Sequence, residues 1–139
     1  MQLTESRNTP RREGDQVAHP VAASTLILIG GLVALDADGF LVPATAAGGK
    51  VVGVAETHAD NRDGVDGDQS TNVRRSVFAF NNSATSAITR KDIGAPAYVE
   101  DDNTVAKAGT AVAGVIIDLG DEGVWVDVGR YAITVTAAA

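Results

Sequence analysis

Two histidines, His19 and His58, are the main candidates for acid–base or metal chemistry in this chain, which contains no cysteine. The lack of cysteine excludes disulfides, thiolate nucleophiles and cysteine-based zinc sites. No Gly-x-Ser-x-Gly turn is present that could expose a serine nucleophile. His19 precedes Pro20 and His58 opens a polar loop, positions typical of solvated side chains. We therefore expect no enzyme activity, no catalytic residue and no cofactor.

The segment Gly48-Gly49-Lys50 superficially resembles a phosphate-binding loop. Such a loop needs a glycine five residues before the second of these glycines, but Ala44 stands there. It also needs a serine or threonine after the lysine to bind Mg²⁺, but Val51 follows. We therefore reject nucleotide binding at this segment.

The loop from Asp60 to Asp68 has the acidic composition of a calcium site, because hard cations bind several oxygen ligands. Its spacing does not match an EF-hand loop, which places a glutamate at the twelfth position. A solvated acidic loop is the favoured interpretation and no metal ligand is assigned. The sequence leaves cation binding here open.

Composition narrows the possible partners. The chain has 139 residues and a net charge of −7, whereas general nucleic-acid binders need a basic surface. No apolar run approaches the roughly 20 residues that span a bilayer, and Met1 is followed by polar residues. We expect a protein that is made in the cytoplasm and has neither a membrane nor nucleic acid as its direct partner.

One phrase occurs twice and organises the chain. The copies run from Gly31 to Val54 and from Gly94 to Val115, with acidic tips at Asp36–Gly39 and Glu100–Asn103. The copies are offset by 64 residues at the tips and by 61 at the Gly-Val pairs. Glycine and asparagine tolerate the positive φ of hairpin turns. Each copy therefore predicts strand, turn, strand, spacer and strand, and we expect the two units to close one barrel.

The remaining strands show period-two alternation of apolar and polar residues. Val73–Asn81 is predicted to be one strand with Phe78 and Phe80 on a common face. Val124–Val128 is predicted to be another strand, with Trp125 on the face opposite Val124, Val126 and Val128. Short strands, turns rich in Gly and Asp, and the lack of an amphipathic helix predict an all-β fold. We expect a small β-barrel with at most one short helix, near 86–93.

Outside the barrel we expect two terminal segments. Residues 1–12 are polar and lack periodicity, which predicts an extended N-terminal arm. We expect residues 13–129 to form the barrel domain and residues 130–139 to form a C-terminal strand or tail. The arm is either a frayed terminus or a segment that orders on a partner, with Arg7, Arg11 and Arg12 meeting carboxylates.

Strand and turn phrases follow one another in a characteristic order. They are 13–17, 31–35, 52–55, Val77-Phe78, 94–99 with Asp101, Asp102 and Val105, 114–116, and 124–128. In order and spacing they resemble a family of small tailed-bacteriophage capsid decoration (cement, head-stabilising) proteins with a β-tulip-like barrel. The resemblance spans about residues 13–128.

The resemblance implies a structural virion protein located on the capsid surface. Members are expected to be homotrimers that clamp neighbouring major capsid subunits after head expansion, with an N-terminal arm reaching across the shell. Here the capsid-contacting residues would be Arg7, Pro10, Arg11 and Arg12. The core or trimer-interface anchors would be Phe78, Phe80 and Trp125.

Two other functions remain as alternatives. One is a phage β-barrel binding module that recognises a receptor or glycan, although scarce aromatic residues argue against stacking on sugars. The other is a small enzyme, which no residue pattern in the sequence supports.

Overall fold

The computed structural model describes residues 1–12 and 14–129, and within them the chain is all-β, as expected. The strands are β1 (Gln16–Pro20), β2 (Thr25–Ile27), β3 (Leu32–Leu35), β4 (Leu41–Pro43), β5 (Lys50–Ala55), β6 (Ala59–Asn61), β7 (Ser70–Arg74), β8 (Val77–Asn82), β9 (Pro96–Asp101), β10 (Thr104–Ala106), β11 (Val112–Gly120) and β12 (Gly123–Val128). A single 3-10 turn, η1 (Arg90–Asp92), precedes β9. The expected C-terminal strand or tail at 130–139 lies outside the described residues.

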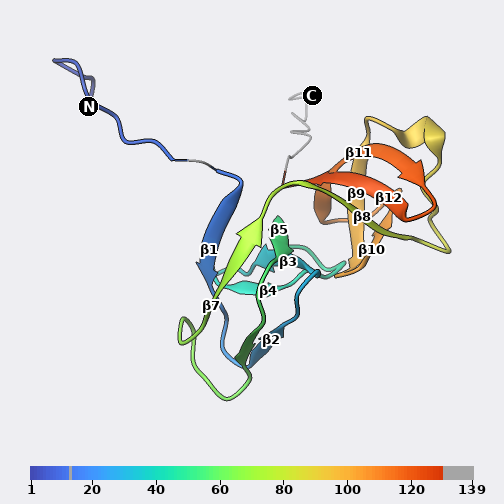
Figure 1. Cartoon of the computed structure of the whole chain (residues 1–139), viewed down its shortest axis with the longest axis horizontal. Coiled ribbons are helices and arrows are strands. Elements are labelled where there is room, and N and C mark those ends of the chain that lie inside the picture. Colours follow the sequence, from blue (N-terminus) through green and yellow to red (C-terminus); the bar gives the residue numbers. More distant parts are fainter. Residues whose placement is uncertain (13, 130–139) are drawn as a thin grey trace.

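The strands form two bodies that lie side by side in Figure 1. One is a five-stranded sheet of order β1-β7-β5-β3-β4, accompanied by the β2-β6 pair. The other is a closed barrel of order β10-β8-β12-β11-β9. The first repeated phrase supplies β3, β4 and β5 of the sheet, and the second supplies β9, β10 and β11 of the barrel. The expectation that both phrases close one barrel is therefore wrong.

The two bodies are copies of one arrangement. Read from β1, the sheet runs β1-β7-β5-β3-β4; read from β8, the barrel runs β8-β12-β11-β9-β10. Val33 pairs with Gly53, and Ala97 pairs with Gly114, which reproduces the offsets of 64 and 61 residues. The strands that flank the phrases correspond as well. We call 16–74 the first unit and 77–128 the second unit.

Backbone hydrogen bonds repeat at the same offsets. The Gly30 amide donates to the Ala55 carbonyl at 2.9 Å, and the Gly94 amide donates to the Ile116 carbonyl at 2.8 Å. In the second unit β10 pairs with β8 in parallel, which closes the barrel. In the first unit a single parallel bridge, Val21 with Leu41, occupies the corresponding place. The first unit thus has one bridge at the place where the second unit closes, but only the second unit is a closed barrel.

A bulge before a glycine marks the third strand of each repeated phrase. The β3–β5 register shifts next to Gly53, and the β9–β11 register shifts next to Gly114. A Cβ on Gly53 would collide with the carbonyl of Arg74, and one on Gly114 with the carbonyl of Asp127. The Val-x-Gly-Val pattern therefore records a close approach of the next strand in both units.

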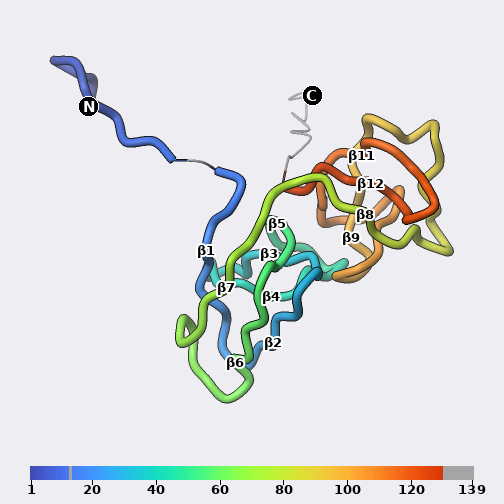
Figure 2. The backbone as a smooth tube through the Cα atoms, in the orientation of Figure 1, coloured from blue at the N-terminus to red at the C-terminus, as the bar shows by residue number. Residues whose placement is uncertain are grey.

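The strand predicted over Val73–Asn81 is in fact two strands. β7 ends at Arg74 and pairs with β1 and β5, whereas β8 begins at Val77 and pairs with β12 and β10. Arg75 and Ser76 carry the chain from the sheet to the barrel, a path that Figure 2 traces. The buried positions change from odd-numbered residues in β7 (Thr71, Val73) to an even-numbered residue in β8 (Phe80), so the inward face changes across Arg74–Ser76. Reading 73–81 as one strand with a single alternation misses this change of face and of sheet.

Two apolar cores lie within the described residues. One lies within the first unit and comprises Val21, Ile27, Val33, Leu41, Ala55, Ala59 and Val73. The other fills the barrel of the second unit and includes Phe80, Val99, Ile116, Val124, Val126 and Val128. That second core also contains Leu32, Ala34, Val51 and Val54, which lie on the outer face of the first sheet. The first unit therefore covers the second barrel; we call this contact the unit junction.

Leu32 provides a test of the unit junction, since its side chain is 0% exposed within the second core. We expect Leu32→Ala to lower the free energy of unfolding by about 2–5 kcal/mol, through lost burial and a residual cavity. Leu28→Ala is the matched control, because Leu28 is 54% exposed. Urea unfolding measures both variants; equal losses would show that the junction contributes no special stability.

Candidate functional site

The N-terminal arm, residues 1–12, lies outside both units. Every one of these residues is exposed, and Figure 1 shows the segment leading away from β1. Among the described residues, no hydrogen bond or ion pair joins the arm to the rest of the chain. All four residues predicted to contact a capsid, Arg7, Pro10, Arg11 and Arg12, lie on this arm. Their side chains are therefore available to a partner.

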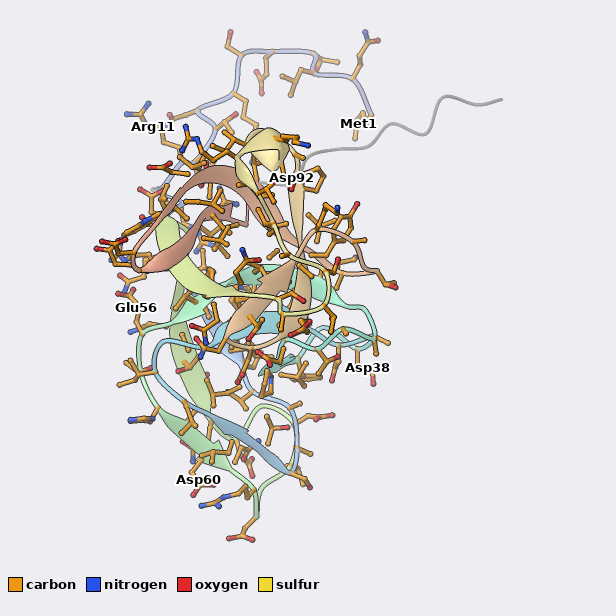
Figure 3. All side chains as sticks on the ribbon, turned by 90° about the vertical axis from the view of Figure 1, so that its right-hand side faces the viewer. Met1, Arg11, Asp38, Glu56, Asp60 and Asp92 are labelled. Carbon is orange, nitrogen blue, oxygen red and sulfur yellow. The ribbon has the colours of Figure 1, made fainter. Side chains whose placement is uncertain are left out.

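Charge distinguishes the arm from the remainder of the chain. The arm holds three arginines and one glutamate, whereas the remaining sequence holds eight Lys or Arg and seventeen Asp or Glu. Figure 3 shows Met1 and Arg11 at one end of the molecule and Asp60 at the other. The arm is a cationic segment on an anionic body, and its guanidinium groups suit bidentate pairing with carboxylates.

The three predicted aromatic anchors have different environments. Phe80 is buried in the second core and lies across from Val124, and Phe78 lies across from Val126 and packs against the same core. Trp125 lies on the opposite face of β12 and is half-buried. As predicted, Phe78 and Phe80 share the core-facing side of β8, and Trp125 lies opposite the buried Val124, Val126 and Val128. A role of these three residues in a trimer interface stays a prediction.

Hydrogen bonds within the acidic segment 60–68, and one to the Ala23 amide, hold this segment in place. Asp60 forms an ion pair with Arg62 at 2.8 Å, and this hydrogen-bonded partner lowers the pKa of Asp60 to about 2. Asp66 accepts a hydrogen bond from the Ala23 amide at 2.7 Å, and Asp68 accepts one from the Val65 amide at 3.1 Å. In the described part of the chain, no group of three or more His, Cys, Asp or Glu side chains has a metal-binding arrangement.

Asn61 anchors this loop, a role that sequence reasoning missed. Its side chain is 2% exposed, and its amide group donates to the carbonyls of Val21, Ala22 and Val65. A Cβ on Gly64 would collide with the side-chain oxygen of Asn61, so a glycine is required beside it. The signal was an asparagine at the inward-facing end of the short strand Ala59–Asn61, two residues after the buried Ala59. The loop therefore has a structural role, because Asn61 links it to the chain at Val21 and Ala22.

His19 lies at an open end of the first unit. It pairs with Thr71 across β1 and β7 and lines a cavity of about 280 Å³ together with Val17, Val73 and Arg75. Partial burial lowers the pKa of His19, because loss of water disfavours the imidazolium. The Nε atom of Arg75 is buried and has no hydrogen-bond partner among the described residues. This end of the unit thus combines apolar side chains with the partly buried His19 and with an Arg75 Nε that lacks a partner among the described residues.

Comparisons with protein-family models, with curated proteins and with solved structures each give no match to this chain. In 1–12 and 14–129, no helix is long and apolar enough to cross a membrane.

The partial burial of His19 predicts a pH dependence of stability. The folded state binds its proton more weakly than the unfolded state, whose pKa is near 6.5. The unfolded state therefore gains protons first as the pH falls, and the free energy of unfolding should decrease below about pH 6.5. We expect His19→Phe, which introduces the residue found at the equivalent position 80, to reduce this slope. Urea unfolding between pH 5 and 8 measures it; an unchanged slope in the variant would contradict the assignment.

Proposed function

We propose that this chain is a capsid decoration (cement) protein of a tailed bacteriophage. It binds the outside of the head as a homotrimer and stabilises contacts between major capsid subunits. The observation that carries the proposal is the exposed cationic arm, which is free of the acidic all-β body. The resemblance of the strand phrases to that protein family supports it independently.

The arm supplies the attachment chemistry. Arg7, Arg11 and Arg12 pair with carboxylates of the major capsid protein, and charge-assisted hydrogen bonds of this kind each contribute about 1.5–3 kcal/mol. Pro10 restricts the backbone between these arginines and reduces the entropy that is lost when the arm becomes ordered. The segment orders on the shell, and its affinity depends on salt concentration.

Stabilisation of the head follows from linkage. A protein that binds only the expanded shell favours that state by mass action. Three arms on one trimer bind with an effective concentration that single arms lack, so that modest contacts suffice. The acidic body faces away from DNA and lipid; it needs neither nucleic acid nor membrane as a partner, and the protein resides on the capsid surface after synthesis in the host cytoplasm.

Deletion of the arm tests the proposal. We expect a chain that lacks residues 1–12 to remain folded and trimeric but to lose binding to expanded empty heads, measured by co-sedimentation. Replacing Arg7, Arg11 and Arg12 by glutamine should weaken binding by at least about tenfold per arginine, which corresponds to about 1.4 kcal/mol or more each.

The matched control changes uncharged arm residues, with Thr4→Ala and Thr9→Ala, and should bind like the unmodified chain. Undiminished binding of the truncated chain would overturn the role of the arm. If the unmodified chain does not bind heads at all, the result would favour a receptor- or glycan-binding module.

A further inference from the structure

The unit junction has two complementary surfaces within one chain. The first is the outer face of β3 and β5, whose Leu32, Ala34, Val51 and Val54 are between 0% and 4% exposed. The second is the end of the second barrel, where β11 and β12 approach β5 and where Phe80, Val126 and Val128 lie in the shared core. An outer sheet face therefore acts as the lid of a neighbouring barrel.

The second unit carries its own copy of the lid face. By the register of the duplication, Pro96, Tyr98, Val112 and Val115 correspond to the four buried lid residues of the first unit. All four are apolar or aromatic, yet all four remain partly exposed. Tyr98 packs over Gly109 and presents a larger side chain than Ala34, its counterpart. We call these four residues the second lid face.

The first unit carries its own copy of the barrel end. Val17, His19, Val73 and Arg75 correspond to Phe78, Phe80, Val126 and Val128 of the covered end. Val17, His19 and Arg75 remain partly exposed and, with the buried Val73, line the cavity of about 280 Å³ described above. The buried Nε of Arg75 lacks a hydrogen-bond partner among the described residues, and such groups are rare unless a partner supplies an acceptor. We call this surface the open barrel end.

We propose that the second lid face of one copy covers the open barrel end of another copy, so that the contact between chains repeats the unit junction within each chain. Tyr98 enters the cavity, its ring packs on Val17 and Val73, and its hydroxyl oxygen accepts a hydrogen bond from Arg75. The occupant is a second copy of this chain, because the lid that fits such a barrel end is already known from the internal junction.

This contact is heterologous, since it joins two different surfaces. Rotational symmetry of order three requires such an interface, whereas a face that pairs with itself gives only a dimer. Three copies joined head to tail form a ring of six units with every lid and every barrel end covered. The number of copies rests on the proposed function, but the pair of surfaces does not.

One substitution on each surface tests the contact. We expect Val115→Lys on the second lid face and Val17→Lys at the open barrel end each to abolish the trimer, whose mass is three times 14.2 kDa. A lysine in an apolar contact leaves an unpaired charge that must be desolvated. Val65→Lys is the control, since Val65 is 66% exposed on the acidic loop. Circular dichroism confirms that each variant is folded, and sedimentation velocity gives its mass.

Mixing the two variants separates this arrangement from any other. Each variant alone should be monomeric, but the intact lid of the Val17→Lys chain can still cover the intact barrel end of the Val115→Lys chain. An equimolar mixture should therefore form a 1:1 dimer that does not grow further. A mixture that stays monomeric, or variants that remain trimeric, would overturn the proposal.

Other results are equally decisive. If the chain's own residues 130–139 occupy the cavity, Val17→Lys should lower the melting temperature and leave the mass unchanged, which overturns the proposal. A monomeric unmodified chain also overturns it. If the variants dissociate as described but the unmodified trimer does not bind heads, the proposed contact between copies is supported and only the capsid function is refuted.

Discussion

The burial of the outer face of one sheet against the end of a barrel is the contact on which both units depend. The second barrel is filled largely by valine and alanine, whose short side chains cannot cover its own end. Leu32, Ala34, Val51 and Val54 complete that core from outside, at exposures of 4% or less. Removing apolar surface from water is the main driving force for folding, so a barrel without its lid forfeits part of its stability. The second unit therefore draws part of its stability from the first.

This constraint divides the molecule into a rigid body and a separate attachment segment. The body consists of two copies of one strand arrangement, of which the second closes into a barrel, and its turns are held by local hydrogen bonds such as those of Asn61. The arm makes no such bonds among the described residues, and it carries the positive charge that the body lacks. In the proposed decoration protein, the body fixes the spacing of three arms and the arms hold capsid subunits together. Attachment and folding then depend on different residues.

Much of the local structure could be predicted from sequence, because hairpin tips and period-two alternation leave clear patterns. The repeat offsets of 64 and 61 residues recur in the strand register. The wider duplication is not visible in the sequence because its outer strands have diverged. His19 and Arg75 stand where the second unit has Phe80 and Val128, and the β5–β7 connection contains an additional strand, β6. Alternation also says which residues share a face but not which sheet they join. Alternation therefore could not predict that Arg75 and Ser76 connect two different sheets, or that the two repeated phrases lie in separate units.

A high-resolution image of expanded heads saturated with the protein tests the central claim most directly. The account predicts three copies per site, joined by Tyr98 of one copy against His19 and Arg75 of the next, with the three arms lying on the major capsid protein. Single copies that touch the shell through the barrels, with arms directed into solvent, would contradict it.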